Sequence, residues 1–201
     1  GSLMTYGMNL ILAAFGSAQT VFGIYFKLQS FVFMPVFGLN NGMVPIIAYN
    51  YGAGHKDRVI KTIKHSVAYG VGIMFVGLLA MHIFPAQLMR MFDAEESLIA
   101  IGAPALETIS LSFVFAGFCI VAGSVFQALG NGVYSMIVSV ARQMCVLLPV
   151  AKLLSLSGEV TLIWWAFPIA ELASVLLTSY FLVRIYRKVI CHIGEPVVQD
   201  A

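Results

Sequence analysis

Long stretches without a formal charge constrain this sequence more than any other feature. No Asp, Glu, Lys or Arg occurs in residues 1–26, 28–54 or 108–141, and Glu171 is the only such residue in 160–183. A helix needs about 20 predominantly apolar residues to cross the hydrocarbon core of a bilayer, and each of these stretches is long enough. The sequence therefore predicts an all-α membrane protein.

The composition agrees with this prediction and argues against several other classes of protein. Of the 201 residues, 60% are hydrophobic and 10% are charged, whereas soluble domains are about 25% charged. The mean hydropathy is +0.94. A net charge of +2 gives no reason to expect a nucleic-acid partner. The three cysteines and four histidines are scattered without CxxC or HExxH spacing, so we predict no disulfide framework, metal site or enzymatic centre.

Turn signals divide the apolar sequence into a bundle of six predicted transmembrane helices, the first of them truncated. We expect Asp93 to cap the fourth helix, with Glu96 at the position of a capping box. Together the helices form one transmembrane lobe over residues 1–190, followed by a polar tail over 191–201. The predicted helices are 2–15, 19–51, 57–84, 94–129, 133–155 and 161–188.

Two of the predicted helices are longer than a bilayer requires. The helices 19–51 and 94–129 each exceed 30 residues. At about 1.5 Å per residue they would measure about 48 Å or more, against about 30 Å of hydrocarbon. We expect these helices to tilt or to kink, and proline is the usual cause of a kink. The candidate kink sites are Pro35, Pro45 and Pro104.

The positions of lysine and arginine predict the orientation in the membrane. Cytoplasmic loops carry an excess of these residues. With six alternating helices, seven basic residues fall on one side and only Arg90 and Lys152 fall on the other. We therefore place the 54–58 loop and the C-terminus in the cytoplasm. The seven residues are Lys56, Arg58, Lys61, Lys64, Arg184, Arg187 and Lys188.

The second predicted helix contains residues that are unusual in a helix that only anchors a protein in a membrane. They lie in the stretch GLNNGMVPIIAYNYGAGHKDR. Gly38 and Gly42 have the GxxxG spacing that lets two membrane helices approach closely. Pro45 removes a backbone hydrogen bond, and Asn40 and Asn41 need polar partners inside a membrane. Irregular polar helices of this kind line the cavities of transporters, so we expect this helix to face protein or a cavity.

Two blocks of sequence resemble a known family. The block FVFMPVFGLNNGMVPIIAYNYGAGHKDRV is similar to the eighth helix and following loop of MATE (multidrug and toxic compound extrusion) transporters. The block SVFQALGNGVYSMIVSVARQMCVLLPVAKLLS is similar to the end of their tenth helix and to the eleventh. The order and spacing of both blocks agree with the family, and the resemblance extends over essentially the whole chain.

The resemblance implies one lobe of a twelve-helix transporter, entered part-way through the first helix of its C-terminal half. The partner would be the missing N-terminal lobe. Members of this family export cationic, amphipathic compounds in exchange for protons or sodium, without another cofactor. We accordingly expect a fragment of a secondary active multidrug exporter in a bacterial inner membrane, in contact with its lipids.

The strongest candidate for ion coupling is Glu171. It lies seven residues after Trp164, or about 10 Å along a helix, which is hydrocarbon depth. An acid at that depth is costly and marks a proton or ion pathway by default. Arg142 could pair with Glu171 or with a carbonyl, or it could extend to the membrane interface. Gln143 follows Arg142 in the Arg-Gln pair that resembles the family.

Several further positions are candidates with weaker support. Lys27 could line the cavity or extend outward from the long second helix. Pro149 closes the Arg-Gln block. We expect Pro168 to free the carbonyl of Trp164 one turn before Glu171. These prolines are candidate helix breaks.

Other readings remain open at this stage. A lipid-linked oligosaccharide flippase of the same superfamily would need several cations for a pyrophosphate, and only Lys27 and Arg142 are available. A membrane-embedded enzyme would need clustered catalytic groups, which the spacing does not provide. An inert fragment of a partial gene is the remaining alternative.

Overall fold

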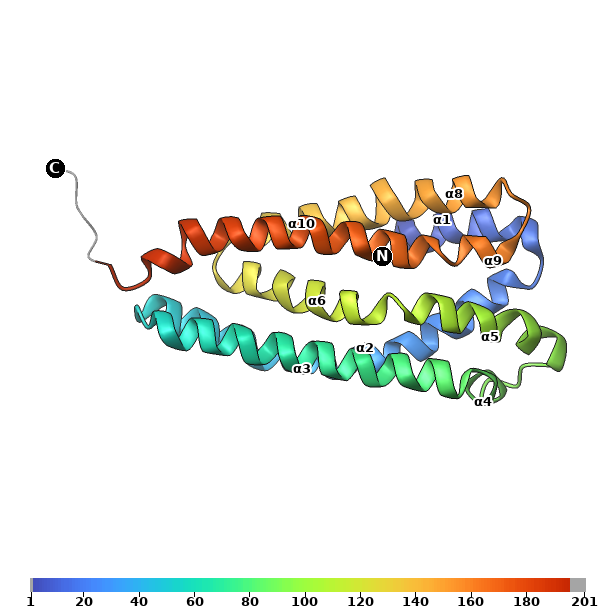
Figure 1. Cartoon of the computed structure of the whole chain (residues 1–201), viewed down its shortest axis with the longest axis horizontal. Coiled ribbons are helices and arrows are strands. Elements are labelled where there is room, and N and C mark those ends of the chain that lie inside the picture. Colours follow the sequence, from blue (N-terminus) through green and yellow to red (C-terminus); the bar gives the residue numbers. More distant parts are fainter. Residues whose placement is uncertain (1, 196–201) are drawn as a thin grey trace.

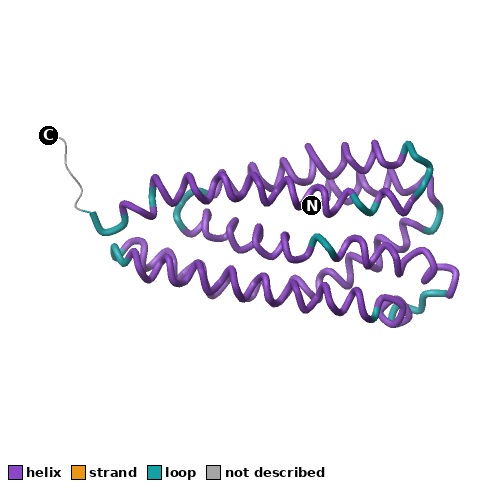
Figure 2. Tube along the Cα trace, viewed as in Figure 1, coloured by secondary structure: helices purple, strands orange, loops and turns teal. Residues whose placement is uncertain are grey.

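The computed structural model describes residues 2–195, and all regular structure in this range is helical. The long helices run along one axis of the molecule and the loops gather at its two ends (Figures 1 and 2). This confirms the predicted all-α fold. The elements are α1 (Ser2–Leu12), η1 (Ala13–Phe15), α2 (Ala18–Gly52), α3 (Lys56–Ile83), α4 (Pro85–Arg90), α5 (Glu96–Ser110), α6 (Phe113–Ala128), α7 (Gly132–Val140), η2 (Ala141–Leu147), α8 (Leu148–Ser155), α9 (Val160–Ile163), α10 (Ala166–Lys188) and η3 (Ile190–His192).

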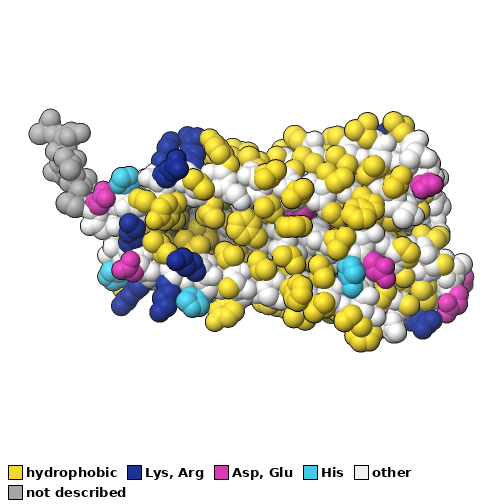
Figure 3. Space-filling model, in the orientation of Figure 1, with side chains coloured by type: hydrophobic (Ala, Val, Ile, Leu, Met, Phe, Trp, Pro, Cys, Tyr) yellow, Lys and Arg dark blue, Asp and Glu magenta, His cyan; other side chains and the backbone are white. Residues whose placement is uncertain are grey.

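Four helical stretches of the described chain are long and apolar enough to cross a membrane. A fifth is added when α5 and α6, which meet at 47°, count as one bent span. The shorter apolar helix Ser2–Phe15 corresponds to the truncated first helix expected from the sequence. On the face drawn in Figure 3, hydrophobic side chains are spread between the two ends, as contact with lipid requires.

The helices form three groups side by side. The second half of α2 lies beside α3 on one side, α5 and α6 lie in the middle, and α1, α8 and α10 lie on the other side (Figure 1). The first half of α2 begins near α1 and crosses the bundle to reach α3. Helix α6 contacts both α3 and α10, so it joins the two outer groups. Helices α2 and α7 both contact α6, so their polar residues can face a cavity beside it.

Glycines of α3 and α6 allow these two helices to approach closely. A Cβ added to Gly70 would lie 2.6 Å from Cγ2 of Val121, and one added to Gly117 would lie 3.0 Å from the carbonyl oxygen of Gly70. Both distances are shorter than ordinary Cβ contacts. Small residues therefore allow the two backbones to pack directly against each other, as in other membrane helix pairs.

The fourth predicted helix, 94–129, is divided in two. The division is at Leu111 and Ser112 and not at Pro104, which lies inside α5. The hydroxyls of Ser110 and Ser112 donate to the carbonyl oxygens of Glu107 and Ile109, at 3.0 and 2.7 Å. Serines that bond to a preceding carbonyl compete with the helical ladder and bend helices. Two such bonds in one turn explain the position of the bend.

The capping box expected at Asp93 and Glu96 does not form. Asp93 has φ +56° and lies in the turn after α4, a short helix that was not predicted from the sequence. Helix α5 begins at Glu96, after Glu95, and no side chain caps it. Glu96 instead pairs with Arg90 at 3.2 Å, with both side chains exposed. The turn places the carboxyl of Asp93 outside the capping position.

Helix breaks at the other prolines also differ from expectation. Helix α2 continues without interruption through Pro35 and Pro45. Pro168 lies in the first turn of α10, after a short break from α9, where its missing N–H leaves no hydrogen bond unmade. The carbonyl oxygen of Trp164 is not free, because it accepts the N–H of Phe167 at 3.3 Å.

One end of the molecule collects most of its basic residues. Lys56 Nζ donates to the carbonyl oxygen of Cys191 at 3.3 Å, so the start of α3 and the end of α10 lie together. Figure 3 shows lysine and arginine side chains gathered at this end. Residues 191–195 of the predicted tail lie against the lobe, with Ile193 buried. The rest of the tail, 196–201, is outside the described residues.

Candidate transport cavity

A cavity of about 710 Å³ opens between α2, α6 and the helix formed by α7, η2 and α8. Asn40, Asn41, Arg142 and Gln143 line it. An adjoining cavity of about 60 Å³ shares Arg142 and Gln143 and reaches Glu171 on α10. The structure thus brings together residues separated by more than 100 positions in the sequence. Five of the six candidate polar residues lie around these two cavities.

Arg142 and Glu171 form an ion pair between the two cavities. Arg142 Nη1 donates to Glu171 Oε1 at 3.2 Å, and the side chains are only 22% and 12% exposed. Of the alternatives left open by the sequence, the structure shows the pairing of Arg142 with Glu171. A buried charge needs such a partner, because removing an ion from water costs several kcal/mol. The pair links η2 to α10 across the cavity wall.

The helix that carries Arg142 widens at that point. Residues Ala141–Leu147 form a π-helical segment between α7 and α8, and Pro149 follows as the second residue of α8. Proline cannot donate a backbone hydrogen bond, which favours a change in the helical ladder before it. Short π-helical segments often occur at functional sites. Here the segment contains both Arg142 and Gln143, which face the cavities.

Three buried oxygen atoms around the cavities have no hydrogen-bond donor among the described residues. They are Gln29 Oε1, Asn40 Oδ1 and Glu171 Oε2. Gln29 lines both cavities, Asn40 lines the larger one and Glu171 the smaller one. A buried acceptor without a donor is costly. The site is therefore suited to a ligand that carries positive charge or hydrogen-bond donors.

Helix α10 continues the polar surface beyond Glu171. Ser174 and Thr178 donate hydrogen bonds to the sulfur of Cys119 on α6, at 3.3 and 3.7 Å. Thr178 and Cys119 also line the larger cavity. Positions 171, 174 and 178 follow the spacing of one helical face. This spacing was a signal in the sequence for the two hydroxyls, although neither was predicted as a site residue.

Gln29 is a further cavity residue that was not predicted from the sequence. It precedes Asn40 by 11 positions, which is close to three turns of about 3.6 residues, so the two amides share a face of α2. The signal was available, but an amide in an apolar helix is less conspicuous than a charge. Lys27, the charged neighbour, is not among the residues that line either cavity. It is exposed, with Nζ 5.7 Å from the centre of the Phe92 ring.

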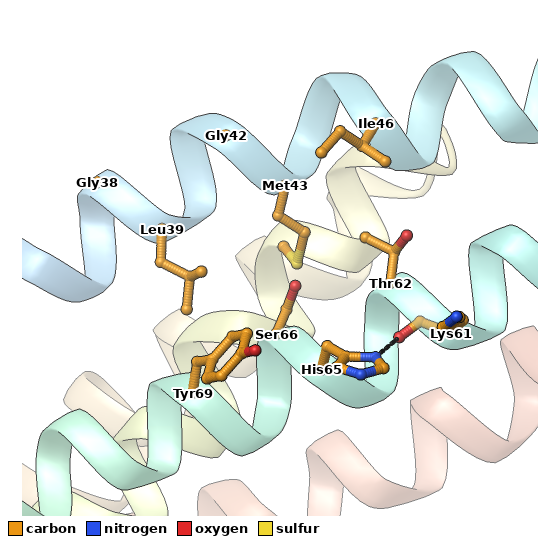
Figure 4. A pocket seen from close by; sticks show the side chains of 10 residues that line it. All are labelled: Gly38, Leu39, Gly42, Met43, Ile46, Lys61, Thr62, His65, Ser66 and Tyr69. Atoms are coloured by element: carbon orange, nitrogen blue, oxygen red, sulfur yellow. Dashed lines mark hydrogen bonds between the residues drawn. The ribbon is translucent and has the colours of Figure 1, made fainter.

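The close packing expected at Gly38 and Gly42 is not made within this lobe. A Cβ added to either glycine would meet no atom of the described residues within 4 Å. Both glycines face an open groove between α2 and α3 (Figure 4). The α2–α3 hairpin packs closely elsewhere, because a Cβ added to Gly77 of α3 would clash with Val32 of α2. At the turn of the hairpin, Asn50 Oδ1 lies 3.3 Å from His55 Nδ1.

A bundle of apolar helices with an ion pair and unpartnered acceptors around an internal cavity defines a class of protein. Polar groups at this depth are characteristic of membrane transport proteins, in which irregular helices line the substrate route. The chain has the features of one lobe of such a transporter.

Comparison with known proteins identifies the family. Residues 2–153 match the family model described as MatE, and the chain belongs to this family. The multidrug export protein MepA of Staphylococcus haemolyticus (strain JCSC1435) is 26% identical over 182 residues, which are 90% of this chain and 40% of MepA. The family resemblance drawn from the two sequence blocks is therefore confirmed.

Solved structures show the same fold. The MATE multidrug transporter DinF-BH is 33% identical, with a TM-score of 0.79 over 94% of this chain and 42% of DinF-BH. The Vibrio cholerae MATE transporter VcmN, in its bent form, is 18% identical with a TM-score of 0.85, over 96% of this chain and 43% of VcmN. The chain spans about two fifths of the length of the proteins it matches. It is a partial MATE protein with the fold of one lobe.

Proposed function

We propose that this chain is the C-terminal lobe of a multi-pass secondary active exporter. The exporter moves cationic, amphipathic compounds out of the cell in exchange for H⁺ or Na⁺. The observation that carries the proposal is the buried ion pair of Arg142 and Glu171 beside a cavity of about 710 Å³. The relationship to proteins called multidrug export proteins supports the substrate class.

Glu171 is the residue we assign to coupling. One of its oxygens accepts from Arg142 and the other has no donor among the described residues. A proton or a sodium ion at the second oxygen would weaken the hold of Arg142 on the carboxylate. The amide oxygens of Gln29 and Asn40 are also acceptors that suit a hard cation. Either ion is compatible with these groups.

The cavity is apolar enough for an amphipathic compound and carries polar groups that could orient it. Phe26, Phe33 and Phe37 supply aromatic surface, while Asn41 and Gln127 supply amides. Arg142 is the one lysine or arginine among the described lining residues, and it is already paired. That charge balance favours a cationic substrate over the pyrophosphate of a lipid-linked oligosaccharide.

The missing N-terminal lobe is the partner we assign, because the relatives are more than twice as long as the matched region. We place the protein in a bacterial inner membrane, with the 54–58 loop and the C-terminus in the cytoplasm. The positive charges at that end support this orientation, since cytoplasmic loops are rich in lysine and arginine. We assign it transport and no enzymatic reaction.

The test is Glu171→Gln in the full-length transporter, reconstituted in liposomes. A neutral amide cannot exchange a proton and binds sodium weakly, so drug-driven movement of H⁺ and of Na⁺ should both be lost. The matched control is Glu107→Gln, which removes an acid on α5 that lines neither cavity. Retained coupling in Glu171→Gln, at normal protein levels, would refute the role. Comparing the parent with and without a sodium gradient decides between the two ions.

A further inference from the structure

A second concave site lies outside the transport cavity, between α2 and α3. Its volume is about 530 Å³. Figure 4 shows α2 passing over α3, with Leu39 and Met43 extending toward α3 and no side chain at Gly38 and Gly42. His65 and Tyr69 form the opposite wall on α3, where their rings lie 6.3 Å apart. The result is a groove open along the side of the lobe.

The groove runs from a charged end to an apolar end. Lys61 lies at its entrance, and Tyr69 lies eight residues further along α3, or about 12 Å. No acidic residue is among the described residues that line it. Lys61 belongs to none of the ion pairs among the described residues. A cation therefore stands at the mouth of an apolar slot, at the end of the molecule that carries most basic residues.

We propose that this groove binds an anionic glycerophospholipid of the adjoining leaflet. Its phosphate would lie at Lys61, and one acyl chain would lie along Gly42 and Gly38. Lysine near a membrane surface attracts anionic lipid headgroups, and the burial of each methylene of an acyl chain is favourable. Two glycines separated by one turn provide a floor that a chain can contact without displacing a side chain.

The shape and charge of the groove select this occupant over a helix of the other lobe. A helix packed against Gly38 and Gly42 would use the apolar end of the groove, and that contact does not call for a cation at Lys61. A phospholipid matches both ends of the groove, because its charged phosphate and its apolar acyl chain lie at opposite ends of the molecule. The site is distinct from the Glu171 cavity, because none of the described residues that line the groove also lines either transport cavity.

The test uses the full-length transporter, delipidated in detergent and titrated with dioleoyl phosphatidylglycerol or dioleoyl phosphatidylcholine. Native mass spectrometry then measures each bound lipid. Gly42→Leu should fill the groove without a clash, since a Cβ there meets nothing within 4 Å. Lys61→Gln should remove the headgroup contact. Each variant should weaken the tightest phosphatidylglycerol site by about tenfold, which corresponds to about 1.4 kcal/mol.

Two control variants separate the groove from general effects. Arg58→Gln removes an exposed charge on the same helix, and Gly72→Leu adds the same side chain at an open glycine of α3 outside the groove. Both should bind phosphatidylglycerol as the parent does. Unchanged binding in Gly42→Leu and Lys61→Gln would overturn the proposal, as would equal affinity for phosphatidylcholine. Dissociation or unfolding of Gly42→Leu, with unchanged binding in Lys61→Gln, would assign the groove to a helix of the other lobe.

Discussion

Arg142 in the π-helical segment η2 donates to Glu171 on α10 at 3.2 Å, and this contact fastens together two helices that border the cavity. Glu171 lies in an otherwise uncharged stretch, 160–183. An unpaired charge would be unfavourable there, so each residue offsets the cost of burying the charge of the other. The same dependence makes the pair sensitive to any cation that competes for the carboxylate.

The first prediction concerns the stability of this pair. Arg142→Leu alone leaves a buried carboxylate without its partner and should destabilise the full-length transporter by about 3 kcal/mol. Adding Glu171→Leu should recover most of that loss, because the double variant has no buried charge. Unfolding midpoints in detergent, for the parent, both single variants and the double variant, form the cycle that measures this coupling. Additive losses would show that the two groups do not depend on each other.

The second prediction concerns the α3–α6 contact. Gly117→Ala places a methyl group 3.0 Å from the carbonyl oxygen of Gly70 and 2.8 Å from Cγ of Met74. Backbone cannot yield as a side chain can, so we expect a loss of about 1–3 kcal/mol. Gly72→Ala, at an open position of α3, should be neutral or stabilising, because alanine favours a helix by about 1 kcal/mol over glycine. Thermal unfolding of the two variants distinguishes them. Equal midpoints would contradict the close approach.

The third prediction concerns topology. Lys56 contacts the carbonyl of Cys191, so a cysteine at position 55 and the native Cys191 lie at one end of the lobe. In full-length protein without other cysteines, both sites should react with a membrane-impermeant thiol reagent only from the cytoplasm. The control is a cysteine at Ser157, in the turn before α9 at the other end of the bundle. Labelling of position 55 from outside, or of all three sites from one side, would reject the orientation.

Helix positions followed from the sequence closely where hydropathy alone determines them. The predicted ranges 19–51 and 57–84 correspond to Ala18–Gly52 and Lys56–Ile83. The bend at Leu111 and Ser112 was missed, because it depends on which carbonyl each serine hydroxyl reaches. Pro104 did not mark the position of this bend, because it lies inside α5. A proline removes one backbone hydrogen bond, and α2 continues as one helix through Pro35 and Pro45.

The residues of the candidate site were likewise predicted from the sequence only in part. Glu171 and Arg142 were found because a charge in an apolar stretch is conspicuous, whereas Gln29 and Thr178 were not, although they line the larger cavity. The GxxxG pair of α2 was read as a packing motif, yet Gly70 makes the close contact with α6. A GxxxG spacing indicates only that one face of the helix carries small residues. It does not state what lies opposite.

The order of residues was enough to predict an apolar helical chain of the MatE family, with its basic residues biased to one side. Those properties are local, since hydropathy and charge are read along the chain and each membrane helix satisfies its own backbone. Three features became visible only in the folded chain: η2 meets α10, two amides and a carboxylate border adjoining cavities, and a groove remains between α2 and α3. Those features depend on how each helix is rotated toward its neighbours, and packing between side chains distant in sequence sets that rotation.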